Sequence, residues 1–129
     1  MTDTIGDVRR FIRGFLSQHG QPVPPKTVAS QKVHLEVWTV GPKRRAVGLE
    51  MDHDSLVNIW VTSSNVPTDL PVTVEVVRKT PKGRVWIDEK GKGANANLSG
   101  YDEFRTRPIT RLVVATIPDA RAILTHLIS

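Results

Sequence analysis

Residues 33–40 read VHLEVWTV, and their side chains alternate between two sets that would lie on opposite faces of a β-strand. The first set holds Val33, Leu35, Val37 and Thr39, and the second holds His34, Glu36, Trp38 and Val40. This period of two predicts a strand, and it marks the point where the chain changes from a helical to an extended pattern.

The segment before this strand predicts a helix and a connector. Residues 3–19 carry apolar side chains at spacings of three, four and seven, which is typical of an amphipathic helix. Thr4 or Asp3 can cap its beginning, and Gly20 stands where a left-handed residue commonly ends a helix. Residues 21–30, QPVPPKTVAS, contain three prolines and no periodicity, so we expect an extended connector there.

The rest of the chain predicts more strands and a final helix. The tripeptide 41–43, Gly-Pro-Lys, is a turn signal, and β-branched and aromatic residues follow it in short runs. The runs predict strands at 44–51, 57–62, 72–79, 84–88 and 109–117, with a turn at 81–83 and a helix at 118–127. The order predicts an α+β fold with an N-terminal helix, a largely antiparallel sheet of four to six strands, and a C-terminal helix packed on one face.

Composition narrows the class of protein. A chain of 129 residues has about the length of one domain, so we expect residues 1–129 to form a single α+β domain. The chain contains no cysteine, which excludes disulfides, thiolate nucleophiles and cysteine-based zinc sites and fits a cytoplasmic protein. Its longest apolar runs are far shorter than a membrane span, and its first residues lack the apolar core of a signal peptide.

The positive charge is concentrated in one part of the chain. The net charge is +5, and residues 78–111 hold nine basic and four acidic side chains, which accounts for the whole excess. Within this region, residues 89–108 read EKGKGANANLSGYDEFRTRP and show no period. An irregular stretch of this length is uncommon in a compact domain and often has a function.

The chemistry of the basic region suggests nucleic-acid binding. Its lysines can meet phosphates, its arginines have forked guanidinium groups suited to phosphate, its asparagines can bond base edges, and its aromatic rings can stack on bases. The candidate residues in this region are Lys82, Arg84, Trp86, Lys90, Lys92, Asn95, Asn97, Tyr101, Arg105 and Arg107. A second basic cluster, Lys43, Arg44 and Arg45, lies at a predicted hairpin tip that can reach a nucleic-acid backbone. The expected partner is therefore DNA or RNA.

Three alternatives to nucleic-acid binding remain open. The basic region can be a solvated connection that Tyr101 and Phe104 hold against the core. The protein can be an interaction or assembly module that binds a protein partner or a second copy through the long loop or the first helix. Glu50, Asp52 and Asp54 alternate along the chain and could hold Mg²⁺ or Mn²⁺ in a nuclease.

No catalytic residue and no cofactor is assigned from the sequence. The Gly-Lys-Gly spacing at 91–93 matches neither the Walker phosphate loop nor the dinucleotide-binding fingerprint. No nucleophile-elbow motif surrounds a serine, and no zinc-finger, RNP, KH or helix-turn-helix motif is evident.

Overall fold

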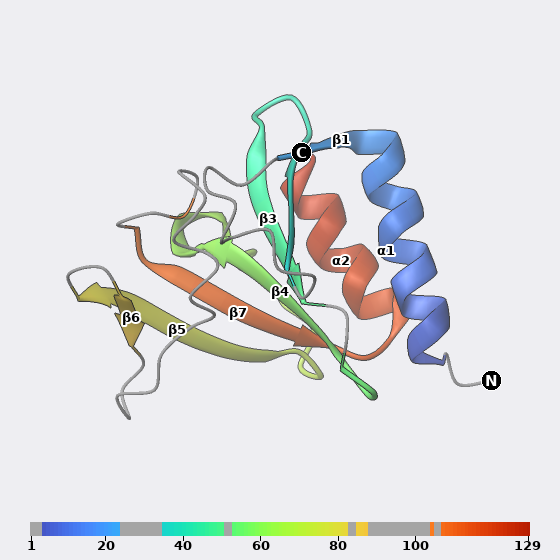
Figure 1. The fold of residues 1–129 in the computed structure, drawn as a ribbon. Helices are drawn as coiled ribbons and strands as arrows, with labels where there is room; N and C mark the ends of the chain where they lie inside the picture. Colours follow the sequence, from blue (N-terminus) through green and yellow to red (C-terminus); the bar gives the residue numbers. More distant parts are fainter. Residues whose placement is uncertain (1–3, 24–34, 51–52, 83–84, 88–103, 105–106) are drawn as a thin grey trace.

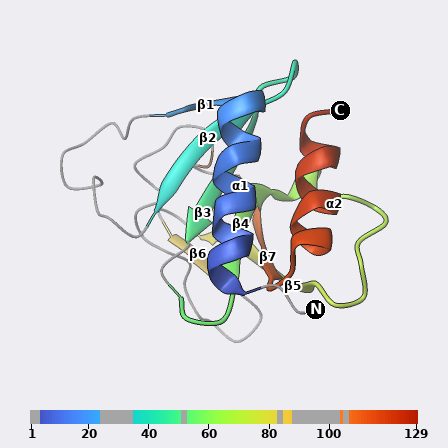
Figure 2. The same cartoon turned by 90° about the vertical axis from the view of Figure 1, so that its right-hand side faces the viewer.

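A computed structural model describes residues 4–23, 35–50, 53–82, 85–87, 104 and 107–129. The elements follow in the order α1 (Ile5–His19), β1 (Gly20–Pro22), β2 (Glu36–Val40), β3 (Arg45–Glu50), β4 (Val57–Thr62), the 3-10 turn η2 (Ser63–Asn65), β5 (Glu75–Lys82), β6 (Val85–Ile87), β7 (Ile109–Val114) and α2 (Ile117–Leu127). The strands pair antiparallel in one sheet in the order β1-β2-β3-β4-β7-β5-β6, and both helices cover the same face (Figures 1 and 2). The predicted α+β fold is confirmed.

Helix α1 begins with a capping box. The Thr4 hydroxyl accepts a hydrogen bond from the Asp7 amide at 3.1 Å, and the Asp7 carboxylate accepts one from the Thr4 amide at 3.1 Å. Together these bonds satisfy two backbone N–H groups that the first helical turn leaves without a partner. Of the two candidate caps that the sequence offers, Thr4 and Asp3, the structure shows Thr4 as the cap.

The predicted role of Gly20 is wrong. Gly20 has an extended backbone, with φ −146° and ψ −178°, because the chain continues directly from α1 into β1 instead of turning in the left-handed region. A glycine is needed there for another reason. A Cβ atom at this position would lie 2.6 Å from the carbonyl oxygen of Thr39 on the neighbouring strand.

The main core lies between the helices and the sheet. Both helices contribute fully buried side chains, among them Ile12 and Leu16 from α1 and Leu124 from α2. They pack on Ile59 of β4 and Leu112 of β7, which are also fully buried. Burial of this apolar face stabilises the arrangement, since a fully buried aliphatic side chain contributes about 1.5–3 kcal/mol.

The opposite face of the sheet carries a second apolar cluster. It consists of Leu35, Val37, Ala46, Trp60, Phe104 and Ile109, with Val23 packed against it. The alternation predicted for residues 33–40 is therefore confirmed over its described part, because Val37 lies in this cluster while Trp38 and Val40 belong to the helix side. Residues 33 and 34 lie outside the described residues.

Several predicted boundaries differ from the structure. Strand β1 makes the described sheet seven-stranded, and it occupies the start of the predicted connector, where its pairing with β2 comes from residues distant in sequence. Strand β5 begins at Glu75 because a turn precedes it, closed by the Val74 amide donating to the Pro71 carbonyl at 3.0 Å. Pro81 lies inside this strand, opposite Trp86, and not in a turn.

The last strand is shorter than predicted. It ends at Val114, and Thr116 caps α2 by accepting a hydrogen bond from the Asp119 amide at 3.3 Å. Ile117 is therefore already helical, although its side chain fits a strand pattern equally well. In the described part of the chain, neither helix has the length and apolar character required to cross a membrane.

Candidate nucleic-acid interface

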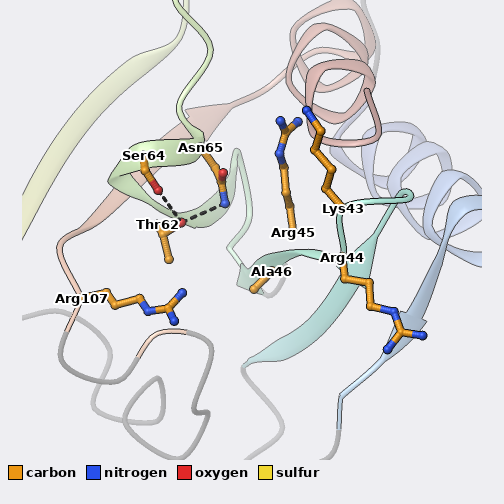
Figure 3. A pocket seen from close by; sticks show the side chains of 8 residues that line it. All are labelled: Lys43, Arg44, Arg45, Ala46, Thr62, Ser64, Asn65 and Arg107. Atoms are coloured by element: carbon orange, nitrogen blue, oxygen red, sulfur yellow. Dashed lines mark hydrogen bonds between the residues drawn. The ribbon is translucent and has the colours of Figure 1, made fainter.

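A hollow with a volume of about 570 Å³ opens beside the tip of the β2–β3 hairpin. Eight described residues line it: Lys43, Arg44, Arg45, Ala46, Thr62, Ser64, Asn65 and Arg107 (Figure 3). Four of these are basic and none is acidic. We call this feature the basic hollow.

The hairpin tip owes its shape to two residues with positive φ. Gly41 has φ +71° and Arg44 has φ +50°, and the Arg44 amide donates to the Gly41 carbonyl at 3.2 Å. This bond closes a tight turn, so that Lys43 and Arg44 are exposed at the tip. The basic cluster at 43–45 thus lies at a hairpin tip, as expected from the sequence.

Arg45 has a structural contact as well as a place in the hollow. Its Nη1 donates to the carbonyl oxygen of His126 at 2.7 Å and lies 3.4 Å from the Ser129 hydroxyl. Because His126 lies in the last turn of α2, the guanidinium charge sits at the negative end of the helix dipole. Figure 3 shows Lys43 extending toward α2 as well, whereas Arg44 points away from it.

Arg107 approaches the hollow from the opposite side, just before β7. Figure 3 shows its guanidinium group pointing toward the space that the hairpin borders. Its position is fixed by the neighbouring backbone, since the Arg107 amide donates to the Phe104 carbonyl at 3.2 Å and the Pro108 carbonyl accepts from the Ser63 amide at 2.9 Å. The start of β7 and the turn η2 are therefore held together.

A neutral polar wall completes the hollow. Thr62, at the end of β4, is 6% exposed, and its hydroxyl accepts a hydrogen bond from Nδ2 of Asn65 at 2.9 Å. The Ser64 hydroxyl lies 3.5 Å from the same oxygen. These contacts hold hydrogen-bonding groups beside the cations, so one surface offers both charge and polar recognition.

The structure brings together some of the predicted site residues. Lys43, Arg44, Arg45 and Arg107 line one hollow, although the sequence placed them in two separate clusters. Lys82 lies in β5 opposite Val85, and Trp86 lies in β6 opposite Pro81. The other candidates lie outside the described residues: Arg84, Lys90, Lys92, Asn95, Asn97, Tyr101 and Arg105.

The polar wall was missed by sequence reasoning. Residues 63–65, Ser-Ser-Asn, have the composition of an ordinary loop between two strands. Nothing in a local pattern shows that this loop faces the hairpin tip at residues 41–44. That proximity depends on the β3–β4 and β4–β7 pairings, which join residues distant in sequence.

The carboxylates considered for a nuclease are differently placed. Glu50 accepts a hydrogen bond from the indole N–H of Trp60, whose ring also faces the guanidinium of Arg111 at 5.8 Å. Asp54 is exposed, and Asp52 lies outside the described residues. Among the residues that the structure describes, no three His, Asp or Glu side chains are grouped so that they could hold a metal ion.

Comparison of the chain with models of known families, with curated proteins and with solved structures found no match.

Proposed function

We propose that the protein is a non-enzymatic module that binds DNA or RNA through the basic hollow. The observation that carries this proposal is the meeting of two sequence-distant basic segments, at 43–45 and at Arg107, around one concave surface whose described lining has no acidic residue. Such a surface concentrates positive potential, and positive potential attracts a polyanion and accelerates its association.

The directions of the side chains favour a chain of phosphates over a single small anion. Lys43 extends toward α2, Arg44 points away from it, and Arg107 enters from the other side (Figure 3). Cations spread in this way can each meet a different phosphate along a backbone, and the guanidinium groups can bind phosphate oxygens in a forked geometry.

A triple variant tests the proposal. Lys43→Gln, Arg44→Asn and Arg107→Gln together remove three charges from the hollow, while Arg45 is left in place because it bonds α2. The matched control, Arg10→Gln, Arg13→Gln and Arg121→Gln, removes three charges from the helices. Fluorescence anisotropy with labelled oligonucleotides measures the dissociation constant of each protein.

We expect the hollow variant to bind at least about tenfold more weakly than the native chain, since one charged hydrogen bond contributes about 1.5 kcal/mol or more. The helix variant should stay within about threefold of the native value, because screened charges outside the contact contribute little. Equal losses in both variants would mean that only net charge matters. Absence of binding by the native chain would overturn the proposal.

A further inference from the structure

We propose that the basic hollow accepts one unpaired base of a single strand at Asn65, with the phosphates of that strand at its cations, so that the protein prefers single strands to duplex. This inference rests on the proposed function and specifies its ligand. The shared chemistry is a phosphorylated nucleoside, either as one unit of a strand or as a free nucleotide. We assign the strand as the ligand.

The size and shape of the hollow suit a single nucleotide. Its volume of about 570 Å³ lies within the range of about 300–1,000 Å³ that is usual for small-ligand sites. A duplex keeps its bases stacked and paired, so that it would lie across the mouth of a hollow without filling it. An unpaired base can leave the stack and enter, as in most sequence-reading proteins that bind single-stranded RNA.

The lining of the hollow offers groups for both parts of a nucleotide. Lys43, Arg44 and Arg107 supply charge for phosphate, and Thr62 and Asn65 supply neutral hydrogen-bonding groups in the same hollow. A carboxamide carries two N–H donors and an acceptor oxygen, the combination that pairs with base edges.

Asn65 is held in position before any ligand arrives. One of its N–H groups donates to the hydroxyl of the buried Thr62, which leaves the carboxamide oxygen and the second N–H for a base. The 3-10 turn η2, which carries Asn65, is itself fixed to β7 by a contact between the hydroxyls of Ser63 and Thr110 at 2.8 Å. Groups that are oriented in advance lose less entropy on binding.

The arginines of the described helices are engaged in contacts within the protein. Proteins that read the major groove commonly insert a helix whose polar side chains are directed at bases. Here each described helical arginine already contacts another residue of the protein. Arg9 donates to the His53 carbonyl, Arg10 pairs with Asp7, Arg13 pairs with Glu36 at 2.8 Å, and Arg121 lies 5.3 Å from the centre of the Phe11 ring.

The experiment compares four labelled or competing ligands at one salt concentration. They are a single strand of about 20 nucleotides, the duplex of the same length, a single strand in which abasic sites replace the bases, and a free nucleoside monophosphate. Asn65→Ala tests the base contact. Thr68→Ala is its control, because Thr68 is exposed nearby in the sequence but does not line the hollow.

We expect the native chain to bind the single strand at least about tenfold more tightly than the duplex or the abasic strand. Asn65→Ala should weaken single-strand binding about five- to tenfold and leave abasic-strand binding unchanged, since a good base contact discriminates by about that factor or more. Thr68→Ala should bind like the native chain, and thermal unfolding should show that both variants are folded. The free monophosphate should compete only weakly, because it lacks the flanking phosphates.

Three kinds of failure can be told apart. If the duplex and the single strand bind equally, or Asn65→Ala binds the single strand like the native chain, this inference is wrong while the proposed function stands. If the monophosphate binds as tightly as the strand, the ligand is a free nucleotide, and the assignment of a strand is wrong. If the native chain binds none of the oligonucleotides, the inference and the proposed function fail together.

Discussion

At the scale of single residues, Arg44 has two separate features: its backbone forms the turn of the hairpin, and its side chain carries a charge. Its φ of +50° is unusual for a residue with a long side chain, whereas asparagine adopts this region much more readily. The exposed guanidinium therefore contributes nothing that the turn itself requires. For this reason we expect Arg44→Asn to remove the charge without disturbing the hairpin, so that a loss of binding in that variant reports on electrostatics.

Replacement of Thr4 tests the capping box. We expect Thr4→Ala to lower the free energy of unfolding by about 1 kcal/mol, because the Asp7 amide loses its acceptor at the first turn of α1. Chemical denaturation at neutral pH measures this loss. Thr4→Ser, which retains the hydroxyl, should keep most of the stability, and equal losses in the two variants would contradict the assigned role.

The same substitution should change a titration. Hydrogen bonds from the Thr4 hydroxyl and the Thr4 amide, together with Arg10, lower the pKa of Asp7 below its usual value. A lowered pKa in the folded state favours folding above the ordinary carboxyl range, and this contribution disappears as the pH falls through the lowered pKa. NMR titration should show the Asp7 pKa rising toward its usual value in Thr4→Ala, whereas an unchanged pKa would exclude the hydroxyl as a cause.

Single residues also show which structural roles can be predicted from neighbouring residues in the sequence. Thr4 was predictable as a cap because a cap depends on its immediate neighbours alone. Gly20 was not, because a glycine after a helix has the same local appearance whether the chain turns or continues as a strand. Its requirement comes from Thr39 on β2, which only the folded pairing brings near.

At the scale of elements, the β2–β3 hairpin is joined to the ends of both helices. The Gly41 amide donates to the His19 carbonyl at the end of α1 at 3.0 Å, and Arg45 donates to the His126 carbonyl near the end of α2. The hairpin tip that borders the basic hollow is thus supported from two sides. Its geometry should depend on how closely the chain packs at Gly41.

Replacement of Gly41 tests that packing. A Cβ at this position would lie 2.6 Å from the Cα of Ile128, and the φ of +71° is unfavourable for alanine. We expect Gly41→Ala to lower the free energy of unfolding by about 2 kcal/mol or more, since a left-handed non-glycine residue alone costs about 1–3 kcal/mol. Thermal or chemical unfolding measures the change.

Gly14 supplies the matched control. It lies in the exposed middle of α1, where a Cβ would meet nothing within 4 Å, so Gly14→Ala should raise stability by up to about 1 kcal/mol. Opposite signs for the two glycine-to-alanine changes are the expected outcome. A loss at Gly14 equal to that at Gly41 would show that close packing at the hairpin is not the cause.

Elements with strong periodicity were predictable, and their partners were not. The helices and most strands follow from spacing, because a buried face imposes its own repeat on the sequence. The short strand β1 and the continuation of β5 through Pro81 depend on hydrogen bonds to β2 and β6. Three residues such as Gly20–Pro22 carry too little pattern to reveal a strand.

At the scale of the whole molecule, the sequence showed which segments carry the excess of positive charge. It did not show where those side chains lie in the folded protein. The two basic segments were recognised separately, and the structure places their described members around a single hollow. The neutral wall formed by Thr62, Ser64 and Asn65 has no charge signal, so that composition could not find it. A binding surface made from distant segments becomes visible only when strand pairings are known.

Salt dependence tests whether the hollow meets phosphates. Each phosphate contact adds about 0.7 to the slope of log affinity against log salt for a single strand. We therefore expect the variant lacking Lys43, Arg44 and Arg107 charges to show a slope smaller by about 2, while the helix variant keeps the native slope. Unchanged slopes for the hollow variant would mean that these side chains do not displace counterions.

The most direct measurement of where nucleic acid binds is a titration of ¹⁵N-labelled protein with a single-stranded oligonucleotide, followed by amide NMR. If the basic hollow is the interface, the largest shift changes fall on the hairpin tip at 43–45, on 62–65 and on Arg107, while the exposed side of α1 is unaffected. Changes that are concentrated on the helices and leave these residues unperturbed would contradict the assignment of this surface.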